Sequence, residues 1–392
     1  MESDFLKYQA QTSPYPLLLK IKKAKGSFIY DTDNKKYLDF IAGVSANTLG
    51  HQPVPVVKAI KDQLDKYMHV MVYGEFLQEP QVELAKIIAE NLPDSLNCTY
   101  LTNSGTEATE GALKLAKRVT GRFEIVGAKN AYHGHTQGAM SVCGNEEKNR
   151  AFRPLIPGIS FIEFNNEEDL LKINENTAGV ILETIQGGAG FILPENNYLW
   201  KVRKRCTEVG ALLILDEIQS GNGRTGTFFG FQQYNIVPDI VITGKGLGGG
   251  MPIGAFISAK SYMDLLTTHP KLGHITTFGG HPVIAAAALA TLKTLFDSSL
   301  INQTNQKESL IRELLIHEDI KEIRGKGLMI ALIMKNEEIA NHLVLTGLKK
   351  GILLFWLLYE PRAVRITPPL TISNEEIRMG CKIILNILNN KS

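Results

Sequence analysis

The chain has 392 residues, of which 44% are hydrophobic and 21% charged, an ordinary balance for a globular protein with one large core and a second, smaller one. The net charge of +2 implies no strongly basic face, so we do not expect nucleic acid to be a main partner. The sequence has no uncharged apolar run of about 18 residues, and its first residues lack the positive charge and apolar core of a secretory signal. We therefore expect no membrane partner.

The four cysteines, Cys98, Cys143, Cys206 and Cys381, are far apart in the sequence and lie mostly in apolar contexts. Their spacing fits neither a metal site nor a disulfide framework. We predict reduced core cysteines, no metal site and a cytoplasmic protein.

The first part of the chain predicts an extended arm followed by a hairpin. Pro14 and Pro16 mark the arm. Residues 26–31 and 36–41 alternate between apolar and polar in the manner of strands, with a turn at 33–34 between them. The elements predicted next are two helices, over residues 56–68 and from Pro80 onward.

From about residue 98 to about residue 294, short apolar strands alternate with helices. The predicted strands are residues 99–102, 124–128, 159–163, 178–183, 212–216 and 239–243. This alternation favours an α/β fold with a mainly parallel sheet flanked by helices.

The rest of the chain is typical of a smaller α+β unit. Strands are predicted over residues 325–333 and 363–367, and Ser373 with Glu376 predicts the start of the last helix. The predicted parts are an N-terminal arm with part of the small domain (1–55), a large domain (56–294) and a C-terminal small domain (295–392).

Ligands of open α/β sheets bind at the carboxyl ends of the strands, so the loops that follow the strands are the informative ones. A helix predicted to start near Gly105 has small residues in its first turn, which leaves backbone amides free to bind an anion. Ser104 and Thr106 add hydroxyl groups. Ser104 with Glu107 also fits an ordinary capping box, so both interpretations stay open at this loop.

Three other loops carry candidate side chains. Tyr132 and His133 follow the strand 124–128, where an aromatic side chain can stack on a flat ring, although loop packing is the commoner role. Glu183 ends one strand and precedes a Gly-rich loop. Asp216 ends the next strand, where a carboxylate binds a metal, bonds to a cationic group or caps the following turn.

Lys245 follows a strand end at Gly244 and precedes four glycines within five residues. A lysine in this setting is poorly solvated and easily approached, which suits an amine that forms an imine with a carbonyl compound. A Gly-rich turn with a solvent-exposed lysine explains the same stretch about equally well.

Together these loops predict one cofactor, pyridoxal 5′-phosphate. Its aldehyde requires a lysine, its pyridine nitrogen requires an acid, and its phosphate requires amides and hydroxyls. An aromatic residue that stacks on the ring completes the set.

With these motifs the sequence resembles the class III aminotransferases, the ornithine or ω-amino-acid subgroup of the fold type I enzymes, from about Pro16 to Leu385. The matching motifs include Asn103-Ser-Gly-Thr-Glu-Ala, Tyr132-His-Gly, Glu183-Thr-Ile-Gln-Gly, Leu215-Asp-Glu-Ile-Gln-Ser-Gly, Gly244-Lys-Gly-Leu-Gly-Gly-Gly, Thr277-Phe-Gly-Gly-His-Pro and Val364-Arg-Ile-Thr-Pro-Pro-Leu.

The resemblance implies a role for each matching residue. Lys245 corresponds to the Schiff-base lysine that also moves the substrate proton, and Asp216 to the partner of the pyridine nitrogen. The other implied cofactor contacts are the phosphate loop Ser104, Gly105 and Thr106, the stacking Tyr132 with its neighbour His133, the supporting Glu183, and Gln219 near the phenolic oxygen.

Two further residues carry implied roles outside the cofactor ring. Thr277 corresponds to a hydroxyl that reaches the phosphate of a neighbouring subunit, which implies a homodimer with shared active sites. Arg365 corresponds to the guanidinium that holds a substrate carboxylate, a bidentate task for which lysine is a poor substitute.

The sequence departs from the family pattern at three substrate positions. His135 stands where these enzymes usually have an arginine for a distal carboxylate. Gly188 stands where they usually have a glutamate that pairs with the other arginine, and Val44 where ornithine members have a tyrosine. The resemblance therefore implies that the chemistry is kept and the substrate contacts are altered, with Arg365 permanently free.

We predict a pyridoxal-phosphate aminotransferase that moves an amino group between a carboxylate-bearing amine or amino acid and a 2-oxo acid, by ping-pong kinetics. The main alternative is a glutamate-1-semialdehyde-type aminomutase or another isomerase with the same cofactor, since those aminomutases also have a histidine at position 135. A non-catalytic subunit is a third possibility. A nucleotide-dependent oxidoreductase is weaker, because residues 246–250 lack the Gly-x-Gly-x-x-Gly spacing.

Overall fold

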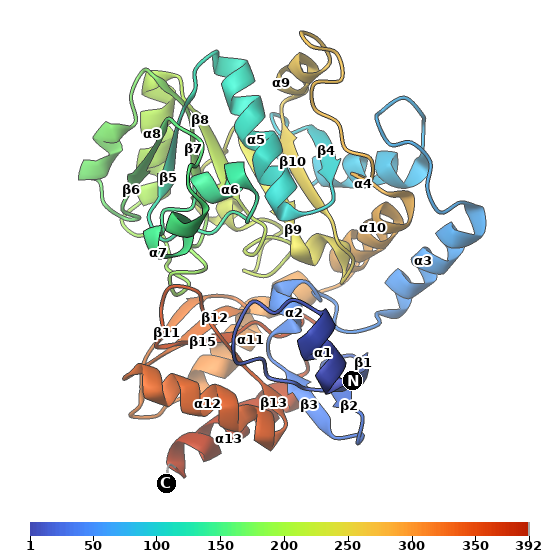
Figure 1. The fold of residues 1–392 in the computed structure, drawn as a ribbon, viewed down its shortest axis with the longest axis vertical. Helices are drawn as coiled ribbons and strands as arrows, with labels where there is room; N and C mark the ends of the chain where they lie inside the picture. The colour runs from blue at the N-terminus through green and yellow to red at the C-terminus, as the bar shows by residue number, and fades with distance from the viewer. Residues whose placement is uncertain (391–392) are drawn as a thin grey trace.

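The computed structural model describes residues 1–390 and arranges them in two halves, one above the other in Figure 1. The upper half contains a seven-stranded sheet, and the lower half contains two four-stranded sheets. One hydrophobic cluster runs through both halves, from Leu84 on the upper side to Ile384 near the C-terminus.

The seven-stranded sheet has the order β4-β10-β9-β8-β7-β5-β6, and all its pairs are parallel except those of β10. Its strands are β4 (Cys98–Thr102), β5 (Glu124–Ala128), β6 (Ile159–Ile162), β7 (Thr177–Glu183), β8 (Leu212–Asp216), β9 (Ile240–Gly244) and β10 (Gly254–Ser258). The predicted mainly parallel α/β sheet is confirmed.

The sequence analysis did not predict β10. This strand lies antiparallel between β4 and β9 and follows β9 after a short connection. A parallel neighbour needs a long crossover, usually a helix, whereas an antiparallel one does not. The strand–helix alternation on which the prediction relied therefore carries no signal for it.

Helices pack over the seven-stranded sheet, and others lie beside its β4 edge (Figure 1). They are α3 (Val54–Lys66), α4 (Glu79–Ala89), α5 (Gly105–Thr120), α6 (Gln137–Ser141), α7 (Glu146–Asn149), α8 (Tyr198–Val209), α9 (Lys260–Met263) and α10 (Pro282–Phe296). The 3₁₀ turns are η1 (Arg150–Phe152), η2 (Glu168–Lys172), η3 (Gly230–Gln233), η4 (Lys245–Gly248) and η5 (Asp264–Leu266). The long helix α5 packs closely on β10, since a Cβ at Gly111 would lie 2.3 Å from the Phe256 ring.

The lower half joins the two ends of the chain. Its first sheet has the order β1-β2-β3-β13, in which the N-terminal hairpin pairs in parallel with a C-terminal strand. The second has the order β11-β12-β15-β14. The strands are β1 (Ile21–Lys25), β2 (Phe28–Asp31), β3 (Lys36–Asp39), β11 (Ile320–Lys326), β12 (Met329–Met334), β13 (Ile352–Leu353), β14 (Phe355–Trp356) and β15 (Ala363–Ile366).

The helices of the lower half are α1 (Glu2–Tyr8), α2 (Ala42–Ser45), α11 (Leu300–Leu314), α12 (Glu337–Lys350) and α13 (Asn374–Asn389). The predicted start of α13 is confirmed, because Ser373 and Glu376 form a reciprocal capping box. The single strand predicted over 325–333 was wrong. It is the hairpin of β11 and β12, which turns at Gly327 with a φ of +63°.

The domain boundaries at 55/56 and 294/295 stay predictions. Within residues 1–390, no single helix is long and apolar enough to cross a membrane. The pair α10 and α11, bent by 70° at the break between them, passes that test by length and composition alone.

Candidate active site

A cavity of about 390 Å³ lies at the carboxyl ends of the central strands. The predicted cofactor contacts that line it are Ser104, Gly105, Thr106, Tyr132, His133, Glu183, Asp216, Gln219 and Lys245. The predicted substrate contacts Val44, His135 and Arg365 line it as well, and so does Gly188. Its size is that of an ordinary small-ligand site.

The order of the strands brings the charged residues together. Glu183 at the end of β7 is the direct register partner of Asp216 at the end of β8. The next strand, β9, ends at Gly244, and Lys245 follows at once. Because neighbouring parallel strands end at the same edge of a sheet, these three side chains share one cavity.

Lys245 starts the turn η4 with a φ of +40°, a conformation that is uncommon for a residue with a side chain. Burial lowers the pKa of its amine to about 8, and the nearby charge of Arg365 acts in the same direction. A solvent-exposed lysine in a Gly-rich turn does not fit this position. The amine is available as a nucleophile at a pH where an ordinary lysine is almost fully protonated.

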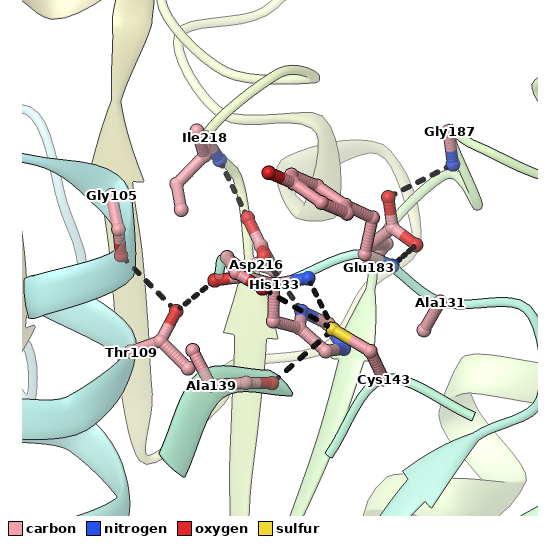
Figure 2. Close-up of polar contacts among 12 residues, drawn as sticks. Gly105, Thr109, Ala131, His133, Ala139, Cys143, Glu183, Gly187, Asp216 and Ile218 are labelled. Atoms are coloured by element: carbon pink, nitrogen blue, oxygen red, sulfur yellow. Dashed lines mark hydrogen bonds and ion pairs between the residues drawn. The ribbon is translucent and has the colours of Figure 1, made fainter. Parts of the chain in front are cut away.

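Asp216 is buried and held by two hydrogen bonds, which Figure 2 shows. Its Oδ2 lies 2.7 Å from Nδ1 of His133, and its Oδ1 accepts the Ile218 backbone N–H at 2.9 Å. His133 is itself fixed, because its backbone N–H donates to the Cys143 sulfur and its carbonyl accepts the Thr109 hydroxyl. The imidazole therefore orients the carboxylate, a contact that sequence reasoning did not foresee.

Glu183 lies beside this pair with its carboxylate among backbone amides. It accepts N–H groups from Tyr132 at 3.2 Å and from Gly187 at 3.0 Å. Burial nevertheless raises its pKa to about 7. The carboxyl group thus ties the Tyr132 loop to the Gly-rich loop after β7, and Tyr132 keeps a partly exposed ring at the cavity.

The loop between β4 and α5 presents the helix N-terminus to the same cavity. The Ser104 hydroxyl accepts the Glu107 N–H at a long 3.4 Å, whereas the Glu107 carboxylate turns to Asn103. Ser104 and Glu107 therefore do not form a reciprocal capping box. The loop packs tightly on β10, since a Cβ at Gly254 would lie 2.0 Å from the Ser104 carbonyl oxygen.

Arg365, on β15, brings a buried guanidinium to the cavity. Its Nε and Nη1 atoms are buried without a hydrogen-bond partner, and its Cζ lies 5.9 Å from the centre of the Phe191 ring. Burial lowers its pKa to about 10, so it stays charged at neutral pH. A buried unpaired cation is costly, and an anionic ligand would relieve that cost.

Val44 and Gln219 both line the cavity. Gln219 Nε2 donates to the Ser45 hydroxyl at 3.3 Å, and Val44 precedes that serine in α2. Thr277, by contrast, is exposed on the loop before α10 and does not line the cavity of its own chain. Its predicted contact with a neighbouring subunit stays a prediction.

Sequence reasoning missed several apolar residues of the lining. Ile185 and Ile218 follow the strand-end carboxylates, whereas Phe355, Trp356 and Leu358 come from β14 and the loop after it. The apolar run that ends shortly before Arg365 contains three of these residues. Such a run is equally typical of a buried strand, so the sequence alone does not indicate a cavity lining.

These residues fit pyridoxal 5′-phosphate. The lysine amine and the imidazole-held carboxylate match its aldehyde and its pyridine nitrogen, and the N-terminus of α5 offers amides and hydroxyls to its phosphate. Figure 2 shows the His133–Asp216 pair beside Glu183 at the centre of this arrangement.

The fold and site define an aminotransferase of fold type I, and comparisons with known proteins agree. The model of the family "Aminotransferase class-III" matches residues 8–388. The chain is 37% identical to the acetylornithine aminotransferase of Caldanaerobacter subterraneus subsp. tengcongensis over 387 residues, covering 96% of this chain and 95% of that protein. Against the acetylornithine aminotransferase of Listeria monocytogenes it is 37% identical over 374 residues, covering 93% of each.

Among solved structures, the ornithine aminotransferase of Toxoplasma gondii superposes with a TM-score of 0.91 at 30% identity, covering 99% of this chain and 94% of that one. The chain therefore belongs to the class III aminotransferases. This family membership confirms the predicted enzyme class and its cofactor, pyridoxal 5′-phosphate. It gives no support to the aminomutase alternative.

Proposed function

We propose that this chain transfers an amino group from a carboxylate-bearing amine or amino acid to a 2-oxo acid, with Lys245 as the catalytic amine. When bound, pyridoxal 5′-phosphate supplies an aldehyde that takes up the amino group and a cationic ring that accepts electrons. The observation that carries the proposal is the convergence of Lys245, Asp216 and the unpaired Arg365 on one cavity.

The chain's own residues then have distinct tasks. Lys245, with its lowered pKa, would accept a proton from the carbon that bears the substrate's amino group and return it to the carbon that was the aldehyde of the bound cofactor. Asp216, oriented by His133, would be the carboxylate that bonds to the ring nitrogen of the bound cofactor. The first turn of α5, with Ser104, Gly105 and Thr106, binds the phosphate.

The substrate side of the proposal rests on Arg365. Its guanidinium can form a bidentate pair with a carboxylate, and no carboxylate of residues 1–390 forms an ion pair with it. The relatives named above are acetylornithine and ornithine aminotransferases, and we expect the amino donor of this chain to carry a carboxylate. His135, Gly188 and Val44 line the same cavity and make the contacts to that donor different.

We also propose a homodimer, on the basis of a large exposed apolar surface. The segments 68–77 and 275–278 carry the exposed side chains Met68, Phe76, Leu77, Ile275 and Phe278. His69 stacks on His281 with ring centres 5.2 Å apart and contacts Phe278, which joins the two segments. Apolar patches of this kind mark association sites, and Thr277 lies within this one.

The location we propose is the cytoplasm. All four cysteines are free thiols, and three of them are buried in the core. A chain with unpaired buried cysteines fits a reducing compartment.

The test of the activity is spectroscopic. The purified protein, loaded with the cofactor, should show an absorbance band that shifts when an amino donor is added, and Lys245→Ala should lose both the band and the shift. Lys260→Ala is the matched control, because Lys260 is an exposed lysine paired only with Asp264. Failure of the unmodified protein to take up the cofactor would contradict the proposal.

The test of the dimer is sedimentation. Leu77→Asp combined with Phe278→Asp should halve the sedimenting mass, whereas Leu171→Asp, at an exposed position on η2, should not. A monomeric unmodified protein would overturn the dimer and leave the assigned chemistry standing.

A further inference from the structure

The wall of the cavity beside Arg365 is made of large apolar side chains. Phe355, Trp356 and Leu358 line it from β14 and the loop that follows. Ile185 and Val44 add further apolar surface to the same lining.

The wall is fixed relative to the guanidinium by strand pairing. Phe355 on β14 is the register partner of Arg365 on β15. Cross-strand partners point to the same face of a sheet with Cβ atoms about 5 Å apart. An apolar ring therefore stands next to the carboxylate-binding group, at a distance that one small molecule can span.

The polar atom of this wall is already engaged. The Trp356 indole N–H donates to the Asn341 side chain of α12 at 2.7 Å. Its ring also packs edge-on against Phe355, with centres 5.2 Å apart. A ligand thus meets hydrocarbon surface here and no free side-chain donor of Phe355, Trp356 or Leu358.

These side chains are incompletely packed by the protein itself. Phe355 is 39% exposed and Leu358 is 50% exposed, and both line the cavity. Apolar surface left open beside a binding group contributes affinity when a ligand covers it.

The wall adjoins Gly188, the position at which the family resemblance places a glutamate. The Tyr359 backbone N–H donates to the Gly188 carbonyl at 2.9 Å. A Cβ at Gly188 would lie 2.9 Å from two atoms of the Tyr359 ring, so a side chain fits there only if the ring moves. The segment 355–359 thus replaces a charged partner of Arg365 with an apolar surface.

The positively charged side chains that line the cavity can bind one substrate carboxylate. Among the described residues that line it, the ammonium and guanidinium groups belong to Lys245 and Arg365. Of the two imidazoles, His133 is bonded to Asp216 and His135 is exposed. With Arg365 bound to one carboxylate and Lys245 engaged in the chemistry, a second carboxylate would find no further arginine or lysine among the described residues that line the cavity.

We propose that the wall formed by Phe355, Trp356 and Leu358 selects substrates with one carboxylate and a hydrocarbon body, such as a branched or aromatic amino acid and its 2-oxo acid. This inference rests on the proposed function, and it names the substrate class of the same site. The carboxylate binds Arg365 while the hydrocarbon covers the wall.

The experiment measures binding without turnover, by tryptophan fluorescence of the cofactor-loaded protein. The chain has two tryptophans, so Trp200→Phe leaves Trp356 as the reporter in the wall. The probes lack an amine: 4-methylpentanoate and 3-phenylpropanoate as hydrocarbon acids, glutarate as a dicarboxylate and acetate as the bare anion. We expect the hydrocarbon acids to change the fluorescence and to bind at least about tenfold more tightly than glutarate or acetate.

Variants separate the wall from the anion site. Leu358→Asn removes hydrocarbon without adding a charge near Arg365, so it should weaken the hydrocarbon acids about tenfold and leave acetate unchanged, because only the former cover the wall. Ile316→Asp, at an exposed apolar position outside the cavity lining, should change neither.

Two results would overturn the inference: glutarate binding as tightly as the hydrocarbon acids, or Leu358→Asn leaving the affinity of the hydrocarbon acids unchanged. Either result, with the Lys245-dependent absorbance shift intact, leaves the proposed aminotransferase standing. Loss of that shift in the unmodified protein overturns the proposed function instead, so the two failures are distinguishable.

Discussion

Glu183 and Asp216 are directly opposite one another at the ends of adjacent parallel strands, yet their surroundings differ. Asp216 is bonded to the His133 imidazole, whereas Glu183 is bonded only to backbone amides. Burial, together with the charge of Asp216, raises the pKa of Glu183 to about 7, although His133 acts the other way. One strand edge thus holds a carboxylate fixed by an imidazole and a second that takes up a proton near neutral pH.

The first prediction concerns the pH dependence of stability in Glu183→Gln. Because the folded pKa is raised, folding takes up a proton between about pH 4.5 and 7, so stability falls across that range and the penalty is complete above pH 7. Glutamine has no such penalty. The variant should gain stability relative to the unmodified protein from pH 5 to pH 8, by up to about 3 kcal/mol.

Thermal unfolding of the cofactor-free protein at several pH values measures this gain. In the variant, the glutamine N–H₂ group faces one of the two backbone N–H groups that the carboxylate bound. The lost hydrogen bond lowers the stability of the variant by an amount that does not vary with pH. Glu175→Gln, at an exposed position, is the control and should show no trend. A difference between Glu183→Gln and the unmodified protein that stays flat with pH would contradict the raised pKa.

The second prediction concerns how the cofactor-free protein takes up pyridoxal phosphate. Burial disfavours the ammonium form of Lys245, so the amine loses its proton near pH 8 and not near 10.5. The rate of uptake, followed by absorbance, should rise from pH 6, reach half of its maximum near pH 8 and level off above about pH 9. Arg365→Gln removes a positive charge that lowers this pKa and should move the midpoint upward, whereas Arg362→Gln should not. A midpoint near 10 in the unmodified protein would rule the idea out.

The third prediction compares two arginines of one segment. Arg365→Lys replaces a planar bidentate group by a point charge at a buried site, and kcat/KM should fall on the order of 100-fold, mainly through KM. Arg362→Lys changes a half-exposed arginine that pairs with Glu360, and it should cost little. Steady-state kinetics with saturating acceptor give the comparison. Equal effects would show that Arg365 does not bind the substrate carboxylate.

The catalytic edge was predictable because its signals are local. A short apolar strand followed by Asp216 or by Lys245 is readable in the sequence, and the rule that ligands bind at strand ends places such residues together. The strand order could not be read in this way. The register of Glu183 with Asp216 depends on β7 and β8 being neighbours, which hydrophobic periodicity does not reveal.

The contacts that were missed join residues far apart in the sequence. His133 contacts Asp216 across 83 positions, and nothing local to either residue indicates the partner. In the sequence, the segment with Phe355, Trp356 and Leu358 is typical of a buried strand. Only the pairing of β14 with β15 shows that this segment lies beside Arg365. The family resemblance showed only that position 188 lacks the usual glutamate side chain. The structure shows that the Tyr359 ring occupies the space next to Gly188.

The fourth prediction tests that space with Gly188→Ala. The added methyl group would lie 2.9 Å from the Tyr359 ring, and overpacking of this kind costs about 1–3 kcal/mol. We expect the segment 355–359 to shift and hydrocarbon acids to bind more weakly, while acetate binding is kept. In a Tyr359→Ala background, the same Gly188→Ala change should cost less stability than it does in the unmodified protein, because the ring that the methyl group meets is gone. Unchanged melting of the single variant would show that the ring yields freely.

The last prediction concerns acceptor choice and uses His135, an exposed residue of the cavity lining. His135→Arg adds a guanidinium that can pair with the second carboxylate of 2-oxoglutarate in a bidentate manner. We expect kcat/KM for 2-oxoglutarate to rise about tenfold relative to that for a 2-oxo acid with a hydrocarbon side chain, a gain of about 1.4 kcal/mol in transition-state binding. His135→Lys should give a smaller gain, because a point charge lacks the planar fork. If His135→Arg leaves the ratio of the two kcat/KM values unchanged, another residue binds the second carboxylate of 2-oxoglutarate. That residue would then be sought on a partner subunit.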